Sequence, residues 1–303
     1  MPPPDAFDPP IGVPQTLQPG VRRVVALNPS PMTYRGTNTY LVGHTDIAVI
    51  DPGPNAPAHL DAICDALTPG QRISHIIVTH AHLDHAPLAR PLQDRCGAPI
   101  LAFGPAHAGR SEVMQRLVAG GLVASGEGVD TQFTPDHTCA DGDIIQGPDW
   151  RLQVLHTPGH MGNHICLGWN DICFTADHVM GWASSLVSPP DGDLTDFMAS
   201  CRRLQNHSWR RFYPGHGDVI EDPHGRLEWL ISHRLARETA ILDALAVGPS
   251  DAQTLAQTIY RDTPASLIPA ATRNVFAQLI DLVGKNKISP AASLAVDTVF
   301  YRR

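Results

Sequence analysis

The sequence predicts an α/β protein, in which a layered β-sheet collects polar residues at one edge and a helical unit follows. Short apolar, β-branched runs recur up to about residue 217, and each leads through a turn to a His or Asp. Beyond residue 217, apolar residues recur at the three- and four-residue spacing of a helix. With 303 residues, 43% of them hydrophobic and 17% charged, the chain can form a substantial core and a smaller second domain.

The N-terminal residues 1–20 are expected to form an irregular arm. Their start, MPPPDAFDPP, lacks the basic residues and the apolar stretch of a secretory signal. Nothing in the chain approaches the ~20 consecutive apolar residues that a membrane helix needs. The 6 cysteines are scattered without a CxxC pair, which is typical of reduced thiols in a cytoplasmic protein. We therefore expect a cytoplasmic protein that has no membrane segment.

The strongest chemical signal is HAHLDH at residues 80–85, directly after the β-branched run 75–79. Three His and a carboxylate crowded at a strand end are costly to bury alone, but a divalent cation uses them as ligands. His80 and His82 lie two residues apart on extended chain and point to one side, where they can bind one ion. Asp84 and His85 can then reach a second ion. If the HxH pattern stood alone, solvent-exposed loop histidines without a metal would be the better interpretation.

The remaining chain offers further ligand candidates at strand ends. These are His160 after the run 152–155, Asp177 after the run 172–176, and His216 after the run 211–213. Upstream, the run 47–50 ends at Asp51, which is a candidate hydrogen-bond partner for metal-binding residues. The pattern predicts that these side chains collect at one edge of the sheet.

Other residues close to these candidates have two possible roles. His164 and His178 are expected near the site, either as substrate contacts or as hydrogen-bond partners of the ligands. Residues 180–193 are rich in turn formers and follow Asp177 closely, as an active-site loop would. A structural connection with a packed Trp182 is the alternative for this loop.

The C-terminal residues 223–303 are predicted to form a helical, winged-helix-like domain. The pattern indicates helices at 223–246, 251–259 and 269–285, and a final strand at 295–301. This part has nine Lys/Arg and seven Asp/Glu, on a chain of net charge −8, so a basic nucleic-acid-binding face is not expected. We expect instead a cap over the substrate cleft or a homodimer surface. The arginine pairs 202–203 and 210–211 are interpreted as a solvated helix end in preference to a phosphate clamp.

Together, HxHxDH, TPGH, the Asp after a strand and PGH resemble the metallo-β-lactamase superfamily over about residues 28–217. NPSP at 28–31 and GTNTYLV at 36–42 resemble its β-lactamase-like protein 2 branch, which adds a winged-helix-like domain. The resemblance implies an αββα sandwich at residues 21–222 that binds two zinc ions. In the family pattern, the first metal is bound by His80, His82 and His160, the second by Asp84, His85 and His216, and Asp177 bridges them.

The predicted activity is hydrolysis at a dinuclear metal site, with Asp84 and Asp177 as catalytic residues. Two divalent ions about 3.5–4 Å apart can hold a bridging hydroxide as the nucleophile. Nitrogen and oxygen ligands suit zinc, and also iron or manganese. The first hypothesis for the substrate is a small ester, thioester or lactone. The alternative, which the branch resemblance favours, is endonucleolytic cleavage of single-stranded RNA. A DNA-binding metal sensor is the third hypothesis, but it requires a basic recognition helix that the sequence lacks.

Overall fold

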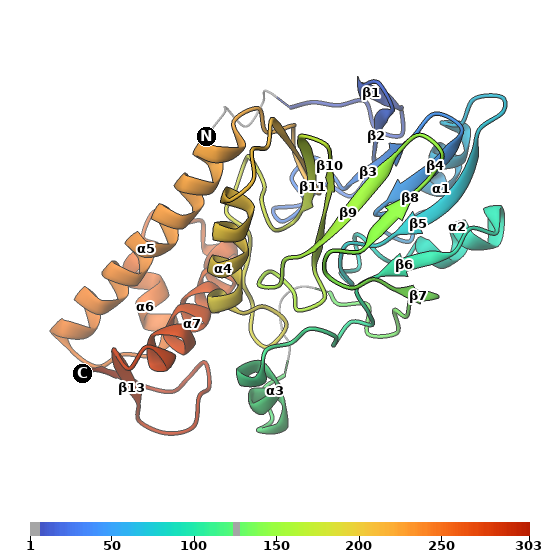
Figure 1. Ribbon diagram of the computed structural model, residues 1–303. Coiled ribbons are helices and arrows are strands. Elements are labelled where there is room, and N and C mark those ends of the chain that lie inside the picture. The colour runs from blue at the N-terminus through green and yellow to red at the C-terminus, as the bar shows by residue number, and fades with distance from the viewer. Residues whose placement is uncertain (1–6, 124–127) are drawn as a thin grey trace.

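The computed structural model describes residues 7–123 and 128–303, so the first six residues of the expected arm lie outside the described part. Two β-sheets pack face to face and carry helices on their outer faces, and a helical unit follows at the C-terminus (Figure 1). This is the αββα sandwich that the family resemblance implies, with the additional helical domain that the sequence pattern predicts. No helix in the described ranges is both long and apolar enough to span a lipid bilayer. All 6 cysteines are free thiols, as predicted.

The first sheet has seven strands in the order β1-β2-β3-β4-β5-β6-β7. They are β1 Gln15–Gln18, β2 Val21–Val25, β3 Asn38–Val42, β4 Asp46–Ile50, β5 Arg72–Ile77, β6 Ile100–Ala102 and β7 His137–Thr138. Helices α1 (Pro57–Asp65) and α2 (Ala89–Cys96) pack on its outer face, and α3 (Glu112–Ala119) precedes β7. Strand β1 lies within the arm that was expected to be irregular, and that expectation is wrong here because these residues pair antiparallel with β2.

The second sheet has five strands in the order β12-β11-β10-β9-β8. They are β8 Ile144–Gln146, β9 Arg151–His156, β10 Ile165–Trp169, β11 Ile172–Ala176 and β12 Arg211–Pro214. Helices α4 (Leu194–Gln205) and α5 (Pro223–Val247) cover its outer face. Most pairs are antiparallel, but β11 and β12 are parallel, so the chain after each of them emerges at the same edge.

The strands are apolar on both faces because both faces of each sheet are covered. In β4, Ile47 and Val49 pack in the core beneath α1 and α2, whereas Ala48 and Ile50 pack between the two sheets. This is the two-residue period of a strand. The continuous apolar runs of the sequence therefore reflect burial on two sides.

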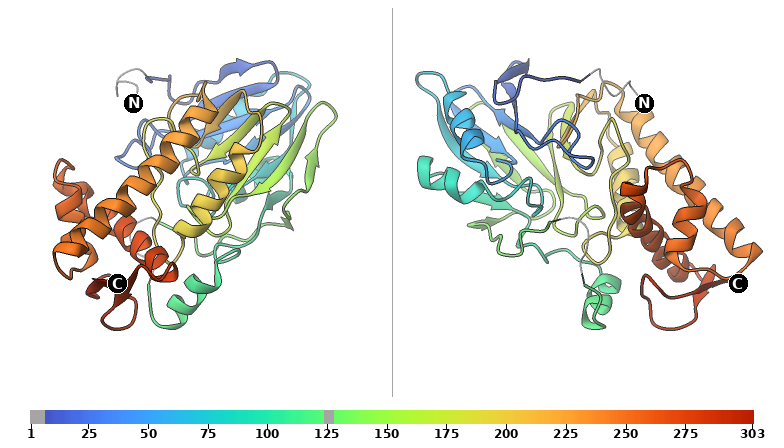
Figure 2. Two further views of the ribbon diagram at one scale, coloured as in Figure 1. Left: turned by 60° about the vertical axis from the view of Figure 1, so that its left-hand side comes forward. Right: turned by 180° about the vertical axis from the view of Figure 1, so that it is seen from behind.

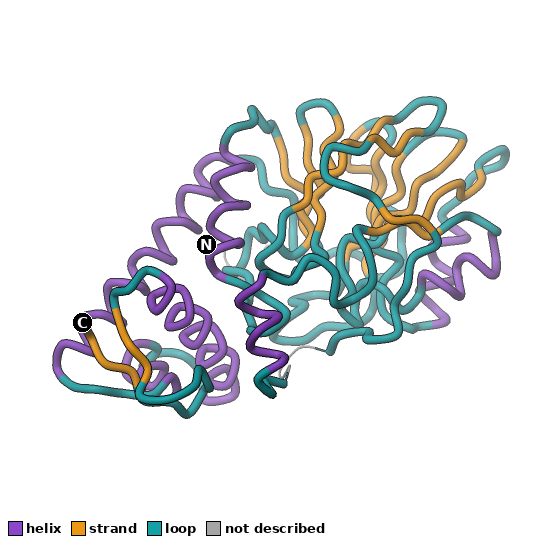
Figure 3. Tube along the Cα trace, turned by 60° about the horizontal axis from the view of Figure 1, so that its bottom comes forward, coloured by secondary structure: helices purple, strands orange, loops and turns teal. Residues whose placement is uncertain are grey.

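The C-terminal unit contains α5, α6 (Ala252–Ile259), a short 3₁₀ turn (Ala265–Leu267), α7 (Ile268–Gly284) and the hairpin of β13 (Ile288–Pro290) and β14 (Phe300–Arg302). Figures 2 and 3 show these helices grouped beside the sandwich. The three predicted helices are present within one or two residues at each end. The predicted strand 295–301 is wrong over most of its length, because Thr298 Oγ1 donates to Ser293 O and closes a turn before β14. Helix α5 begins at Pro223, where the second domain is expected to begin, and the division into domains stays a prediction.

Candidate metal centre

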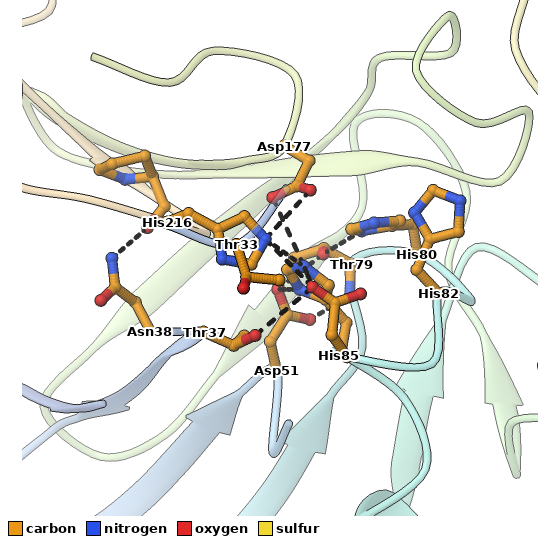
Figure 4. A network of polar contacts seen from close by, with 12 residues as sticks. Thr33, Thr37, Asn38, Asp51, Thr79, His80, His82, His85, Asp177 and His216 are labelled. Carbon is orange, nitrogen blue, oxygen red and sulfur yellow. Dashed lines mark hydrogen bonds and ion pairs between the residues drawn. The ribbon is translucent and has the colours of Figure 1, made fainter. Parts of the chain in front are cut away.

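Four loops that follow strands bring the predicted ligands together at one edge of the sandwich (Figure 4). Ligand-type atoms of the first group, His80, His82, His160 and Asp177, lie within 4.8 Å of one another. The same holds for a second group, which consists of Asp84, His85 and His216. Every residue that the sequence suggested as a metal ligand thus belongs to one of two neighbouring clusters.

The Asp177 carboxylate lies between the two clusters. Its Oδ2 is 3.7 Å from Nε2 of His160 and 3.3 Å from Nε2 of His216. Its Oδ1 is 3.4 Å from Nε2 of His85. One side chain therefore contacts histidines of both groups.

In three histidines, Nδ1 donates a hydrogen bond to a neighbouring oxygen, and this orients Nε2 toward the cluster. His85 Nδ1 is 2.9 Å from Asp51 Oδ2, His160 Nδ1 is 2.7 Å from Leu186 O, and His216 Nδ1 is 3.1 Å from Gly36 O. Because all three partners can only accept, each Nδ1 carries the hydrogen. In the neutral ring, Nε2 is then left with a free lone pair, which is the tautomer that metal-binding histidines use.

His80 supplies an independent test of whether a cation fits. Its side chain is fully buried, and its Nε2 has no hydrogen-bond partner among the residues that the structure describes. A buried nitrogen without a partner is costly, and coordination of a cation removes that cost. The donor set of imidazoles and carboxylates therefore fits a divalent metal.

Asp51 occupies the position behind the ligands that the sequence suggested for it. It accepts hydrogen bonds from the Thr79 backbone nitrogen and hydroxyl, both at 2.7 Å. Because the Thr79 hydroxyl gives its only hydrogen to Asp51, it can accept one from His80 Nδ1, which is 3.0 Å away. Asp51 thus orients His85 directly and His80 through Thr79.

Two motif positions require glycine because neighbouring atoms lie too close to leave room for a Cβ. A Cβ at Gly215 would collide with Oδ1 of Asp177. Gly159 has a φ of +136°, and a Cβ there would collide with the backbone of Phe197 in α4. These contacts explain why glycine precedes both His160 and His216.

The metal-free cluster is electrostatically polarised. Burial lowers the pKa of His85, but the carboxylates of Asp84, Asp177 and Asp51 outweigh it and hold that pKa well above its usual range. Burial also lowers the pKa of His216, yet Asp177 and Asp84 raise it to about 10. For Asp177, burial raises the pKa, but His216 and His85 bring it well below its usual range. The shifts of His85 and His216 favour positive charge beside Asp84 and Asp177, whereas burial lowers the pKa of His80, His82 and His160.

The secondary candidates differ in position. His164 and His178 are fully buried and do not line the cleft into which the clusters open, which argues against substrate contact. The hydrogen-bond partners of both side chains lie outside the clusters, and that of His178 Nε2 is Cys201 Sγ at 3.5 Å. His164 Nδ1 is 3.0 Å from the Thr157 hydroxyl. Trp182 does line the cleft and stacks on Tyr34, with ring centroids 5.1 Å apart.

The cleft has a volume of about 610 Å³. One wall comes from the first part of the loop 180–193, from Met180 to Leu186, and another from Asn28 to Thr33. A third wall comes from the C-terminal unit, where Tyr260, Leu267 and Asn274 face the cleft. No local sequence pattern indicates these C-terminal residues, because their position depends on how the helices dock.

The cleft is not built for a polyanion. Within residues 7–123 and 128–303, no Lys or Arg lines it. Three of the four arginines that were considered as a phosphate clamp pair with acids, Arg203 with Asp141, Arg210 with Asp171 and Arg211 with Glu221, and Arg202 is exposed outside the cleft. Their pairing with acids agrees with the interpretation as a surface feature.

Comparisons with known proteins agree with this geometry. A model of the metallo-beta-lactamase superfamily matches residues 32–216, and one of the beta-lactamase associated winged helix domain matches residues 252–293. The beta-lactamase-like protein 2 homolog of Drosophila melanogaster is 30% identical over 296 residues, which cover 94% of each chain. An atrochrysone carboxyl ACP thioesterase from Cryptosporiopsis sp. (strain 8999) is 31% identical over 241 residues, which cover 78% of this chain and 66% of that protein.

Solved structures show the same fold over nearly the full chain. A beta-lactamase domain protein from Burkholderia ambifaria has a TM-score of 0.81 at 20% identity, covering 99% of this chain and 96% of that one. A metallo-beta-lactamase family protein from Thermus thermophilus has a TM-score of 0.75 at 23% identity, covering 95% and 100%. The two family models and the 30% identical relative show that the chain belongs to the metallo-beta-lactamase superfamily of hydrolases and carries an associated winged helix domain.

Proposed function

We propose that this hydrolase works with two divalent metal ions and cleaves a small acyl substrate, for which a thioester is the best candidate. The observation that carries the proposal is the Asp177 carboxylate, which contacts histidines of both clusters. The proposed ligands are His80, His82 and His160 for one ion and Asp84, His85 and His216 for the other, with Asp177 shared by both.

The residues around the cluster have different proposed roles. Two bound ions would supply an acidified water as nucleophile and a positive charge next to the scissile carbonyl. Asp84 lines the cleft with a side chain 25% exposed, and we propose that it orients the attacking water and accepts its proton. Asp51 and Leu186 O hold the imidazoles in place from behind. Asp51 and Leu186 O therefore fix the orientation of the imidazoles before a substrate binds.

The cleft favours a neutral acyl substrate. Its walls carry apolar side chains, including Leu83, Met180 and Leu267, and the described part contributes no Lys or Arg to them. A thioester also agrees with the activity in the name of the fungal thioesterase relative. Esters and lactones have the same reacting carbonyl and remain within the proposal.

RNA cleavage is the second candidate because of the resemblance to the β-lactamase-like protein 2 branch. Phosphate backbones are bound mainly by Lys and Arg, and the described lining of the cleft has neither. Zinc is the proposed metal, and iron or manganese suits the same nitrogen and oxygen donors. A cytoplasmic location and a homodimer stay predictions.

A metal and activity screen tests the proposal. Protein purified without chelator should contain about two metal ions per chain, because the ligands exceed what one tetrahedral ion uses. The zinc- and manganese-loaded protein should hydrolyse acyl thioesters faster than lactones, phosphodiesters or short RNA. Asp177→Asn should lower the metal content and reduce turnover by orders of magnitude, while His207→Ala, an exposed histidine outside the cluster, should change neither. Binding of one ion only, with His216→Ala unchanged in metal content, would contradict the dinuclear site.

A further inference from the structure

The cleft wall formed by α7 carries a single polar side chain, Asn274, in the midst of small and apolar neighbours. Its Oδ1 accepts hydrogen bonds from the Val187 backbone nitrogen at 3.0 Å and from the Arg234 guanidinium at 2.9 Å. Both partners can only donate, so the oxygen must face them. The amide orientation is therefore determined by its surroundings.

The amide nitrogen of Asn274 is available to a molecule in the cleft. The side chain is half-buried and lines the cleft, and no residue in the described ranges accepts a hydrogen bond from its Nδ2. An amide nitrogen carries two hydrogens. Asn274 consequently offers donors to whatever occupies the cleft.

Arg234 strengthens this donor. It lies on α5 with 2% of its surface exposed, packs over the Phe197 ring at 5.1 Å and also donates to Ser185 O. Among the described residues, no carboxylate pairs with its guanidinium. A buried positive charge on the carbonyl side of an amide polarises it and makes its N–H groups better donors. The favoured acceptor is an oxygen with partial negative charge.

Asn274 lines the same cleft as His160, Asp177 and His216. His160 Nδ1 donates to Leu186 O, and Asn274 Oδ1 accepts from the next residue, Val187. Consecutive Cα atoms are only about 3.8 Å apart, so Asn274 contacts the same segment that supports the His160 imidazole. One turn earlier, Ala270 and Ala271 continue the same wall with apolar surface.

We propose that Asn274 binds a carbonyl oxygen of the substrate's acyl group, and that the adjoining surface of α7 receives its hydrocarbon chain. The winged helix domain then supplies the acyl subsite of the hydrolase. This inference rests on the proposed function for the identity of the acyl substrate. A neutral oxygen is the occupant, because the described lining of the cleft has no Lys or Arg to bind a phosphate.

Asn274→Asp is the decisive variant, since it deletes the donor and keeps the oxygens that Val187 and Arg234 require. Two probes are used: the octanoyl thioester of N-acetylcysteamine, and its ketone analogue in which CH2 replaces the sulfur. We expect the variant to keep its melting temperature and metal content. Its Kd for the ketone, measured by calorimetry, should rise about ten- to hundred-fold, the usual effect of losing one well-placed hydrogen bond. The KM for the thioester should rise by a similar factor.

The control is Asn206→Asp, at the end of α4 and outside the cleft. It should bind the ketone as the wild type does. If the wild type fails to cleave the thioester but binds the ketone in an Asn274-dependent way, the proposed function is wrong and the acyl subsite stands. Equal ketone binding by the wild type and Asn274→Asp, or no binding by either, would overturn the assignment of Asn274.

Discussion

Asp51 adopts a backbone conformation that only a well-defined environment maintains. Its φ is 51°, in the left-handed region that residues other than Gly, Asn and Asp rarely occupy. The conformation directs the carboxylate toward Thr79 and His85, which hydrogen-bond to both of its oxygens. Strain of this kind is typical of functional sites, where the surrounding contacts compensate for it.

We expect Asp51→Asn to weaken zinc binding without unfolding the protein. The amide can accept from Thr79 with its oxygen, but it then presents an NH2 group to His85 Nδ1, which also carries a hydrogen. Loss of such a hydrogen bond behind a metal ligand typically lowers metal affinity about 10- to 100-fold. Competition with a chromophoric chelator measures this. The control is Asp46→Asn, at the start of β4 and paired with Arg72 at the surface. Unchanged affinity in Asp51→Asn would show that Thr79 alone positions the ligands.

At the scale of elements, the loop 180–193 is held by arginines of the C-terminal helices. Arg226 of α5 donates to Met180 O and Ala183 O at 2.7 and 2.6 Å. Arg234 of α5 donates to Ser185 O, and Arg273 of α7 donates to Pro189 O. Because Leu186 O in this loop accepts from His160, the helices support a proposed metal ligand indirectly.

Replacing Arg234 by Met should loosen this loop. Methionine fills a similar volume but leaves Ser185 O without its donor, which costs about 1–3 kcal/mol for a buried group, and leaves Asn274 Oδ1 with only the Val187 backbone nitrogen. We expect faster hydrogen exchange in residues 180–193 and a several-fold loss of zinc affinity through His160. Arg261→Met, at an exposed arginine of the same unit, serves as the control. If exchange of the loop stays at the wild-type rate, the arginine contacts are not what orders it.

The sequence predicted those parts of the fold and the site that depend on local patterns. His80, Asp177 and His216 each follow a strand, and strand ends can be recognised from apolar runs and turn residues. The contacts of Arg226, Arg234 and Arg273 with the loop join residues 43 to 85 positions apart, so no local pattern reveals them. The role of Asn274 could not be predicted from a local pattern either. It depends on two hydrogen-bond donors that reach its side chain only when the helices dock.

Helix α5 joins the C-terminal unit to the sandwich. Leu227 and Leu230 of this helix and Ala277 of α7 belong to the same buried core as α4 and the outer face of the second sheet. The arginine contacts add polar links between the same elements. The C-terminal unit therefore cannot separate from the sandwich without exposing part of its core.

We predict that the full-length protein unfolds in one transition, and that zinc shifts this transition as a whole. A ligand that binds only the folded state stabilises it by about 2.7 kcal/mol at a concentration 100 times its Kd. For a chain of 303 residues this corresponds to a rise in melting temperature of about 4 °C. Scanning calorimetry with and without zinc measures the shift, and Asp177→Asn, which lacks the shared carboxylate, should lose most of it. Two separate transitions, with the lower one insensitive to zinc, would show that the winged helix domain unfolds independently. In that case the core shared by α4, α5 and α7 would be too weak to couple the acyl subsite to the metal cluster.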